Sequence, residues 1–137
     1  MPGIFGVSAG VDFVESKGME KIMQHELKLC QKIYNGLRTI SGCKMYSEYP
    51  TVGKSVPTLS FNLRDVPSFS VAEYLGDRNV AVRAGLHCAP MAHRRLGTAE
   101  TGTVRVSCSL FNTEREADYL LDILKNYKSM KKIRKVY

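Results

Sequence analysis

The chain has 137 residues, of which 44% are hydrophobic and 24% charged, and it carries a formal net charge of +7. This length and composition suit one soluble globular domain over residues 1–137. No segment approaches the roughly 18 consecutive apolar residues of a membrane span, and no basic-then-apolar export signal opens the chain. We therefore expect no membrane association and a cytoplasmic location.

The first half of the chain predicts two helices followed by two strands. Apolar residues spaced by three and four predict a helix over residues 4–15, ended near Gly18, and a longer helix over 19–40. Residues 43–46 favour a short strand. Residues 56–63 alternate apolar side chains with smaller or polar ones, which is typical of a strand.

The second half predicts a further helix and two more strands. Ser68 is placed to cap a helix that runs through Leu75. Strands are predicted over residues 80–83 and 103–109. Between them, residues 84–102 contain three glycines and a proline, so we expect an extended loop there.

The last helix is expected to begin after Asn112-Thr113 and to run to about Ile133. Six basic residues crowd the last thirteen positions: Lys125, Lys128, Lys131, Lys132, Arg134 and Lys135. A helix dipole favours cations near its C-terminal end, whereas the alternative interpretation is a nucleic-acid-binding patch. Because no nucleic-acid-binding motif accompanies these residues, we expect no nucleic-acid partner.

The order of these elements favours the α+β class. The fold it indicates is a two-layer sandwich, with a mostly antiparallel sheet of about four strands covered by helices. No internal repeat interrupts this order, which again suits a single domain.

The residues with the most chemical potential lie in the predicted loop between the last two strands. Cys88 follows His87 directly and lies five positions after Arg83. Nearby positive charge and an imidazole favour the thiolate, which is the reactive form of cysteine. Gly85 lets the backbone bend and extends the reach of the loop. On these residues alone, Cys88 is either reactive or merely exposed.

Other histidines and cysteines have less specific interpretations. Zinc-binding residue types occur at His87, Cys88, His93 and Cys108, but no pair has the spacing of a standard zinc site, so no metal is predicted. His93 and the two arginines after it are interpreted as a solvated loop face. Cys30, Cys43 and Cys108 are interpreted as free thiols packed as small hydrophobic residues.

Six segments, taken together, resemble the cysteine desulfurases, in the branch related to bacterial sulfur-mobilising enzymes and selenocysteine lyases. They are the helix over residues 2–10, the strand Val56–Asn62, and the runs Arg83–Pro90, Leu96–Thr98, Gly102–Ser107 and Phe111–Glu116. In their order they span nearly the whole chain. The resemblance implies the small, C-terminal domain of a class V aminotransferase, within the fold-type I PLP-dependent transferases.

The resemblance also implies a role for each site residue. Cys88 attacks the sulfur of a PLP-bound L-cysteine, becomes a persulfide and releases alanine. Arg105 grips the substrate carboxylate, since a guanidinium fork binds both carboxylate oxygens. Arg83 supports the loop or the charge of the active site. His87 takes the proton from Cys88 or orients the loop.

The family's PLP-binding lysine belongs to a large domain that is absent from this chain, and the sequence has no His-Lys pair. We therefore expect PLP in the complete enzyme and none bound to this chain, which is expected to be inactive and monomeric alone. The complete enzyme is expected to be a homodimer that passes sulfur to an acceptor protein, as in iron–sulfur cluster assembly. Two alternatives stay open, a selenocysteine lyase domain and a stand-alone sulfur-carrier module.

Overall fold

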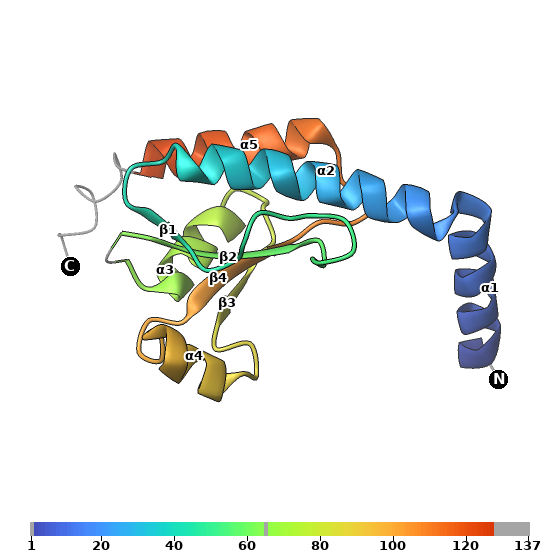
Figure 1. Ribbon diagram of the computed structural model, residues 1–137, viewed down its shortest axis with the longest axis horizontal. Coiled ribbons are helices and arrows are strands. Elements are labelled where there is room, and N and C mark those ends of the chain that lie inside the picture. Colours follow the sequence, from blue (N-terminus) through green and yellow to red (C-terminus); the bar gives the residue numbers. More distant parts are fainter. Residues whose placement is uncertain (1, 65, 128–137) are drawn as a thin grey trace.

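Four short strands form one antiparallel sheet in the computed structural model, which describes residues 2–64 and 66–127 (Figure 1). In chain order the elements are α1 (Pro2–Lys17), α2 (Met19–Arg38), β1 (Cys43–Met45), β2 (Thr58–Leu63), α3 (Ser68–Gly76), β3 (Arg83–Gly85), α4 (Pro90–Leu96), β4 (Thr103–Ser107) and α5 (Glu114–Lys125). The strand order is β1-β2-β4-β3, and each neighbouring pair is antiparallel. The predicted α+β class and four-stranded antiparallel sheet are confirmed.

The two faces of the sheet differ in polarity because side chains alternate along each strand. On the central strands, Leu59, Phe61 and Val104 are fully buried in a core built with α2, α3 and α5. The residues between them, Ser60 opposite Arg105 among others, belong to the other face. Figure 1 shows α2 and α5 along one side of the sheet and α4 beyond its β3–β4 end. The sheet therefore has one face covered by helices and one polar face.

The two longest helices of the core layer cross closely. A Cβ at Gly36 of α2 would lie 2.3 Å from Cδ1 of Leu121 in α5, so any larger residue would force Leu121 to move. The helix α5 begins after Thr113, as the sequence predicts, and its first turn forms a capping box. The hydroxyl of Thr113 accepts from the Glu116 N–H, and the Glu116 carboxylate accepts from the Thr113 N–H.

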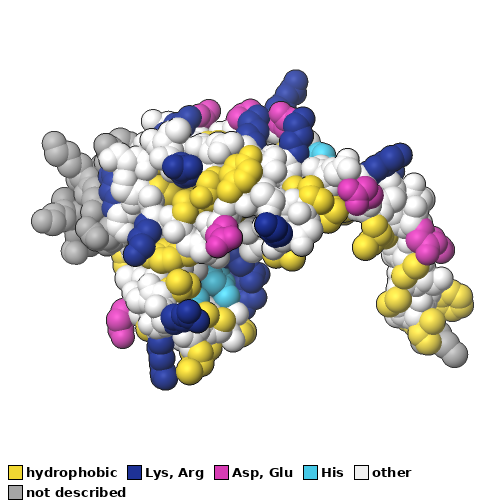
Figure 2. All heavy atoms as spheres, in the orientation of Figure 1, with side chains coloured by type: hydrophobic (Ala, Val, Ile, Leu, Met, Phe, Trp, Pro, Cys, Tyr) yellow, Lys and Arg dark blue, Asp and Glu magenta, His cyan; other side chains and the backbone are white. Residues whose placement is uncertain are grey.

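The helix α1 contributes nothing to this core. None of its residues is buried, and Ile4 and Phe5 are more than two-thirds exposed. The ring of Phe13 stacks on Phe111 with centroids 5.8 Å apart. Figures 1 and 2 show α1 extending from the start of α2, away from the sheet, with hydrophobic side chains along it. Of the helices in the described ranges, none is long and apolar enough to cross a membrane.

The third strand lies further along the chain than predicted. β3 pairs with β4 only from Arg83 onward, whereas residues 80–83 were expected to form it. After the left-handed Asn79, the N–H of Val80 donates to the Leu75 carbonyl at the end of α3. The chain then diverges from β4 and lines a pocket with Val106. Tertiary packing, and not the apolar alternation, decides where the ladder begins.

The predicted loop over residues 84–102 contains a helix, so this prediction was wrong in part. α4 starts at Pro90, and it ends before Gly97, which is left-handed with φ 68°. Proline suits the first position of a helix because it needs no N–H there, and glycine suits the position after the end. The residues that suggested a loop are therefore the two ends of a helix.

Three element ends also differ from prediction. Ser68 does not cap α3 with its side chain; its hydroxyl donates to the Thr101 carbonyl at 2.7 Å. β2 and β4 are each two residues shorter than expected. α5 ends at Lys125, and the predicted continuation toward Ile133, with the basic residues from position 128 onward, lies outside the described residues.

Replacing Phe61 by alanine should destabilise the domain by about 3–5 kcal/mol, because it deletes a fully buried ring at the centre of the sheet. The matched control is Phe5→Ala, which removes the same ring from an exposed site and should change the stability by less than about 0.5 kcal/mol. Urea unfolding followed by circular dichroism measures both. Similar losses for the two variants would contradict the described core.

Candidate active site

Cys88 lies on the short connection between β3 and α4 and is exposed. Its Sγ lies 3.9 Å from Nη2 of Arg83, the basic residue that the sequence analysis expected near it. His87 and Cys88 both adopt left-handed backbone conformations, with φ of 50° and 61°. Two such residues in succession are uncommon outside glycine. The surrounding contacts must therefore hold the thiol in this position.

The ring of His87 provides one of these contacts. Its Nε2 lies 3.0 Å from the carbonyl oxygen of Thr103 and 3.1 Å from the hydroxyl of the same residue. A carbonyl only accepts, so Nε2 carries the proton and Nδ1 is left with a lone pair. This Nδ1 is buried and has no hydrogen-bond partner among the described residues. The imidazole thus joins the Cys88 loop to β4, and its other ring nitrogen stays unprotonated.

Electrostatics favour the neutral form of this imidazole. Burial lowers the pKa of His87 below its usual value, and the nearby charges of Arg105 and Arg83 act in the same direction, although the hydrogen bond to Thr103 opposes them. At neutral pH His87 is therefore a base and not a cation.

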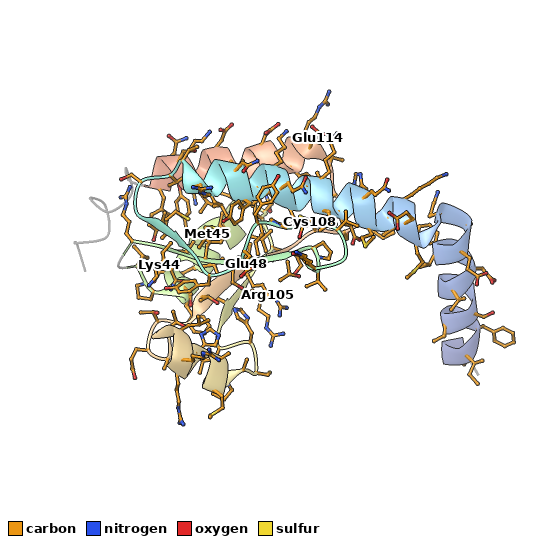
Figure 3. The ribbon with its side chains drawn as sticks, in the orientation of Figure 1. Lys44, Met45, Glu48, Arg105, Cys108 and Glu114 are labelled. Atoms are coloured by element: carbon orange, nitrogen blue, oxygen red, sulfur yellow. The ribbon has the colours of Figure 1, made fainter. Side chains whose placement is uncertain are left out.

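Arg105 lies on β4, directly opposite Arg83 of β3 and Ser60 of β2. Figure 3 shows Arg105 on the side of the sheet away from α5. Its Nε is buried and without a hydrogen-bond partner, and the salt bridges between described residues involve neither arginine. Two guanidinium groups on one face, without a salt bridge to another described residue, fit an anionic group such as a carboxylate. Figure 2 shows histidine and basic side chains together at this end of the molecule.

His93 was expected on a solvated loop face, and that prediction was wrong. It is 5% exposed, and its Nδ1 lies 2.8 Å from the hydroxyl of Thr98, which is also buried. The rings of His93 and His87 lie 5.8 Å apart, so His93 packs behind the histidine that precedes Cys88. No periodic pattern indicates a buried position for His93, because the seven-residue α4 is too short to show one.

A close backbone contact sets the entry into β4. Gly102 has φ 62°, and a Cβ there would lie 2.7 Å from Cα of Gly85 and from Oγ of Ser68. The Gly102 carbonyl accepts from the Asn62 side chain at 2.9 Å. Gly85 and Gly102 are the two ends of the segment that carries Cys88, and this contact holds them together. Gly102 directly precedes Thr103, the residue to which His87 binds.

Residues 83–107 hold four arginines and two histidines but no lysine. The segment that carries Cys88 therefore contains no lysine amine, and its two facing guanidinium groups suit an anionic group. Within residues 2–64 and 66–127, no three His, Cys, Asp or Glu side chains are grouped so as to hold a metal ion.

This geometry agrees with comparisons to known proteins. The family described as aminotransferase class-V matches residues 1–120, and the chain belongs to this family. A probable cysteine desulfurase of Staphylococcus epidermidis is 33% identical over 123 residues, which are 90% of this chain and 29% of that protein. Another, from Halalkalibacterium halodurans, is 35% identical over 118 residues, 86% of this chain and 28% of that protein.

Solved structures give the same result. The apo structure of a cysteine desulfurase from Thermococcus onnurineus matches with a TM-score of 0.81 and 30% identity, over 88% of this chain and 29% of that chain. The cysteine desulfurase CsdA of Escherichia coli matches with a TM-score of 0.79 at 23% identity, over 89% of this chain and 29% of that chain, and supports the fold alone. The chain thus spans less than a third of the relatives that it matches.

Alanine at Gly102 should damage the site more than alanine at Gly97. Both glycines are left-handed, so each substitution costs about 1–2 kcal/mol in backbone strain. Only at position 102 does the added Cβ overlap neighbouring atoms, which adds about 1–3 kcal/mol. Urea unfolding measures the stability, and iodoacetamide labelling of peptide 84–94 measures the reactivity of Cys88. Equal effects at both positions would rule out the close contact with Gly85.

Proposed function

We propose that this chain is the small, C-terminal domain of a PLP-dependent cysteine desulfurase, with residues 1–137 as one unit. The observation that carries the proposal is the placement of Cys88 directly after His87 and 3.9 Å from Arg83, beside a sheet face that presents Arg105. The family membership and the similarity to proteins named as cysteine desulfurases support it.

Cys88 is proposed as the nucleophile. Its thiolate forms a bond to the sulfur of L-cysteine, and the carbon–sulfur bond of the substrate breaks with its electron pair left on carbon. Protonation of that carbon gives alanine, and Cys88 is left as a persulfide. Arg83 stabilises the thiolate through the 3.9 Å contact, and His87 is proposed to take the thiol proton or to orient the loop through its hydrogen bonds to Thr103.

Arg105 is proposed to bind the substrate α-carboxylate. Its guanidinium offers parallel donors to both carboxylate oxygens, and its buried Nε has no protein partner among the described residues. PLP, held by a domain outside this chain, would supply the electron-withdrawing ring that weakens bonds to the substrate's α-carbon. No residue of this chain is assigned to hold PLP, since the sequence has no His-Lys pair.

The remaining partners follow from the same proposal. They are a second copy of the complete protein, in a cytoplasmic homodimer, and a sulfur-acceptor protein. The exposure of Cys88 lets an acceptor thiol reach the persulfide. A stand-alone sulfur carrier would need the cysteine but not a carboxylate-binding arginine, so Arg105 favours the enzyme.

The test is alanine and sulfide release from L-cysteine by the complete protein. Cys88→Ser should abolish both releases. Cys43→Ser is the matched control and should retain them, because Cys43 lies on β1 and burial raises the pKa of its thiol to about 11. Undiminished alanine release from Cys88→Ser would remove Cys88 as the nucleophile and favour selenocysteine as the substrate.

Arg105→Lys should reduce kcat/KM for L-cysteine by about 10- to 100-fold, mostly through KM, because lysine keeps the charge but loses the two-pronged contact. Steady-state kinetics of the complete protein measure this, with PLP absorbance as the check on cofactor binding. An unchanged KM would assign the carboxylate to another residue.

A further inference from the structure

Two cysteines far apart in the sequence meet in the core. Cys30 belongs to α2, and Cys108 follows the end of β4, yet their Sγ atoms lie 3.3 Å apart. Cys30 is 0% exposed and Cys108 is 9% exposed. Figure 3 shows Cys108 where the sheet meets the helix layer. This pair is separate from the proposed active site, which uses neither thiol.

Cys108 borders a pocket formed by described residues. A pocket of about 280 Å³ lies between α5, α2 and the segment that precedes β3, and Cys108 is part of its lining. Cys30 is not among the residues that line this pocket. The polar side chains of Asn112 and Glu116 also line the pocket. A small polar solute can therefore approach Cys108 first.

The hydrogen bond makes the two sulfurs unequal. The Cys30 thiol donates to the Cys108 sulfur. This hydrogen bond lowers the pKa of Cys108, although burial opposes it, and raises the pKa of Cys30. Because the thiolate is the nucleophilic form, Cys108 is the sulfur that reacts first with an electrophile.

We infer that Cys30 and Cys108 form a redox-active dithiol site that a peroxide converts to a disulfide. Cys108 attacks one peroxide oxygen, which breaks the O–O bond, releases one water and leaves a sulfenic acid. Cys30 then attacks the Cys108 sulfur, and its thiol proton leaves with the displaced hydroxide as a second water. The protein loses two hydrogens, and the peroxide is reduced to two waters.

The geometry requires only a short movement. The sulfurs must approach from 3.3 Å to about 2.05 Å, the length of a disulfide bond. The new bond would fasten α2 to the connection between β4 and α5, across 78 positions of sequence. In a reducing compartment such disulfides are transient and report the redox state.

The experiment treats the 137-residue chain with hydrogen peroxide, blocks the remaining thiols with N-ethylmaleimide and digests it with trypsin without reduction. The four cysteines fall in four different tryptic peptides, 29–32, 39–44, 84–94 and 106–115, so each pairing has its own mass. We expect peptides 29–32 and 106–115 to be linked and to separate on reduction. Peroxide consumption without this linkage would overturn the inference.

Two variants test the order of events. Cys30→Ser should stop at a sulfenic acid on Cys108, which dimedone traps in peptide 106–115, whereas Cys43→Ser should still form the disulfide. The oxidised wild-type chain should also unfold at a higher urea concentration than the reduced chain, which is measured without any substitution. A lower midpoint, or dimedone labelling only at Cys88, would count against the site.

Discussion

The pairing of β2 with β4 is the constraint on which the rest of the structure depends. Its register sets Phe61 opposite Val104 and Ser60 opposite Arg105, so alternate residues of the same two strands serve the core and the candidate active site. A slip of one residue would exchange the faces, placing a guanidinium in the core and apolar side chains outside. Core stability and site geometry are therefore two results of one register.

Sequence patterns predicted those helices and strands in which buried residues recur at the spacing of the element. α2, α5, β2 and β4 each present apolar residues to the core at regular spacing. Both ends of α2, β2 and β4, and the start of α5, lie within a few positions of the prediction. Residues 80–82 show the limit of this reasoning, because they alternate like a strand yet line a pocket beside β4. α4 shows another limit, because Pro90 and Gly97 mark helix ends only once the helix between them is known.

In the candidate site, too, one group of residues could be predicted from the sequence and another could not. A local motif indicated Cys88, His87 and Arg83, and the sheet brings them to the same end as Arg105. The contacts that hold this arrangement escaped prediction, because they join segments far apart in sequence: His93 with Thr98 behind His87, Gly102 against Gly85, and Cys30 against Cys108. Their residue types were visible, but their proximity arises only from the fold.

The opposed arginines on β3 and β4 have a consequence for the whole domain. Like charges directly opposite on neighbouring strands repel, so Arg83 and Arg105 weaken the ladder that carries Cys88. An anion bound between them offsets this repulsion. By linkage it raises the free energy of unfolding, and the increase is larger for an anion that binds more tightly. Anion binding and the stability of the β3–β4 pair are thus thermodynamically coupled. The domain is most stable when an anionic ligand is bound.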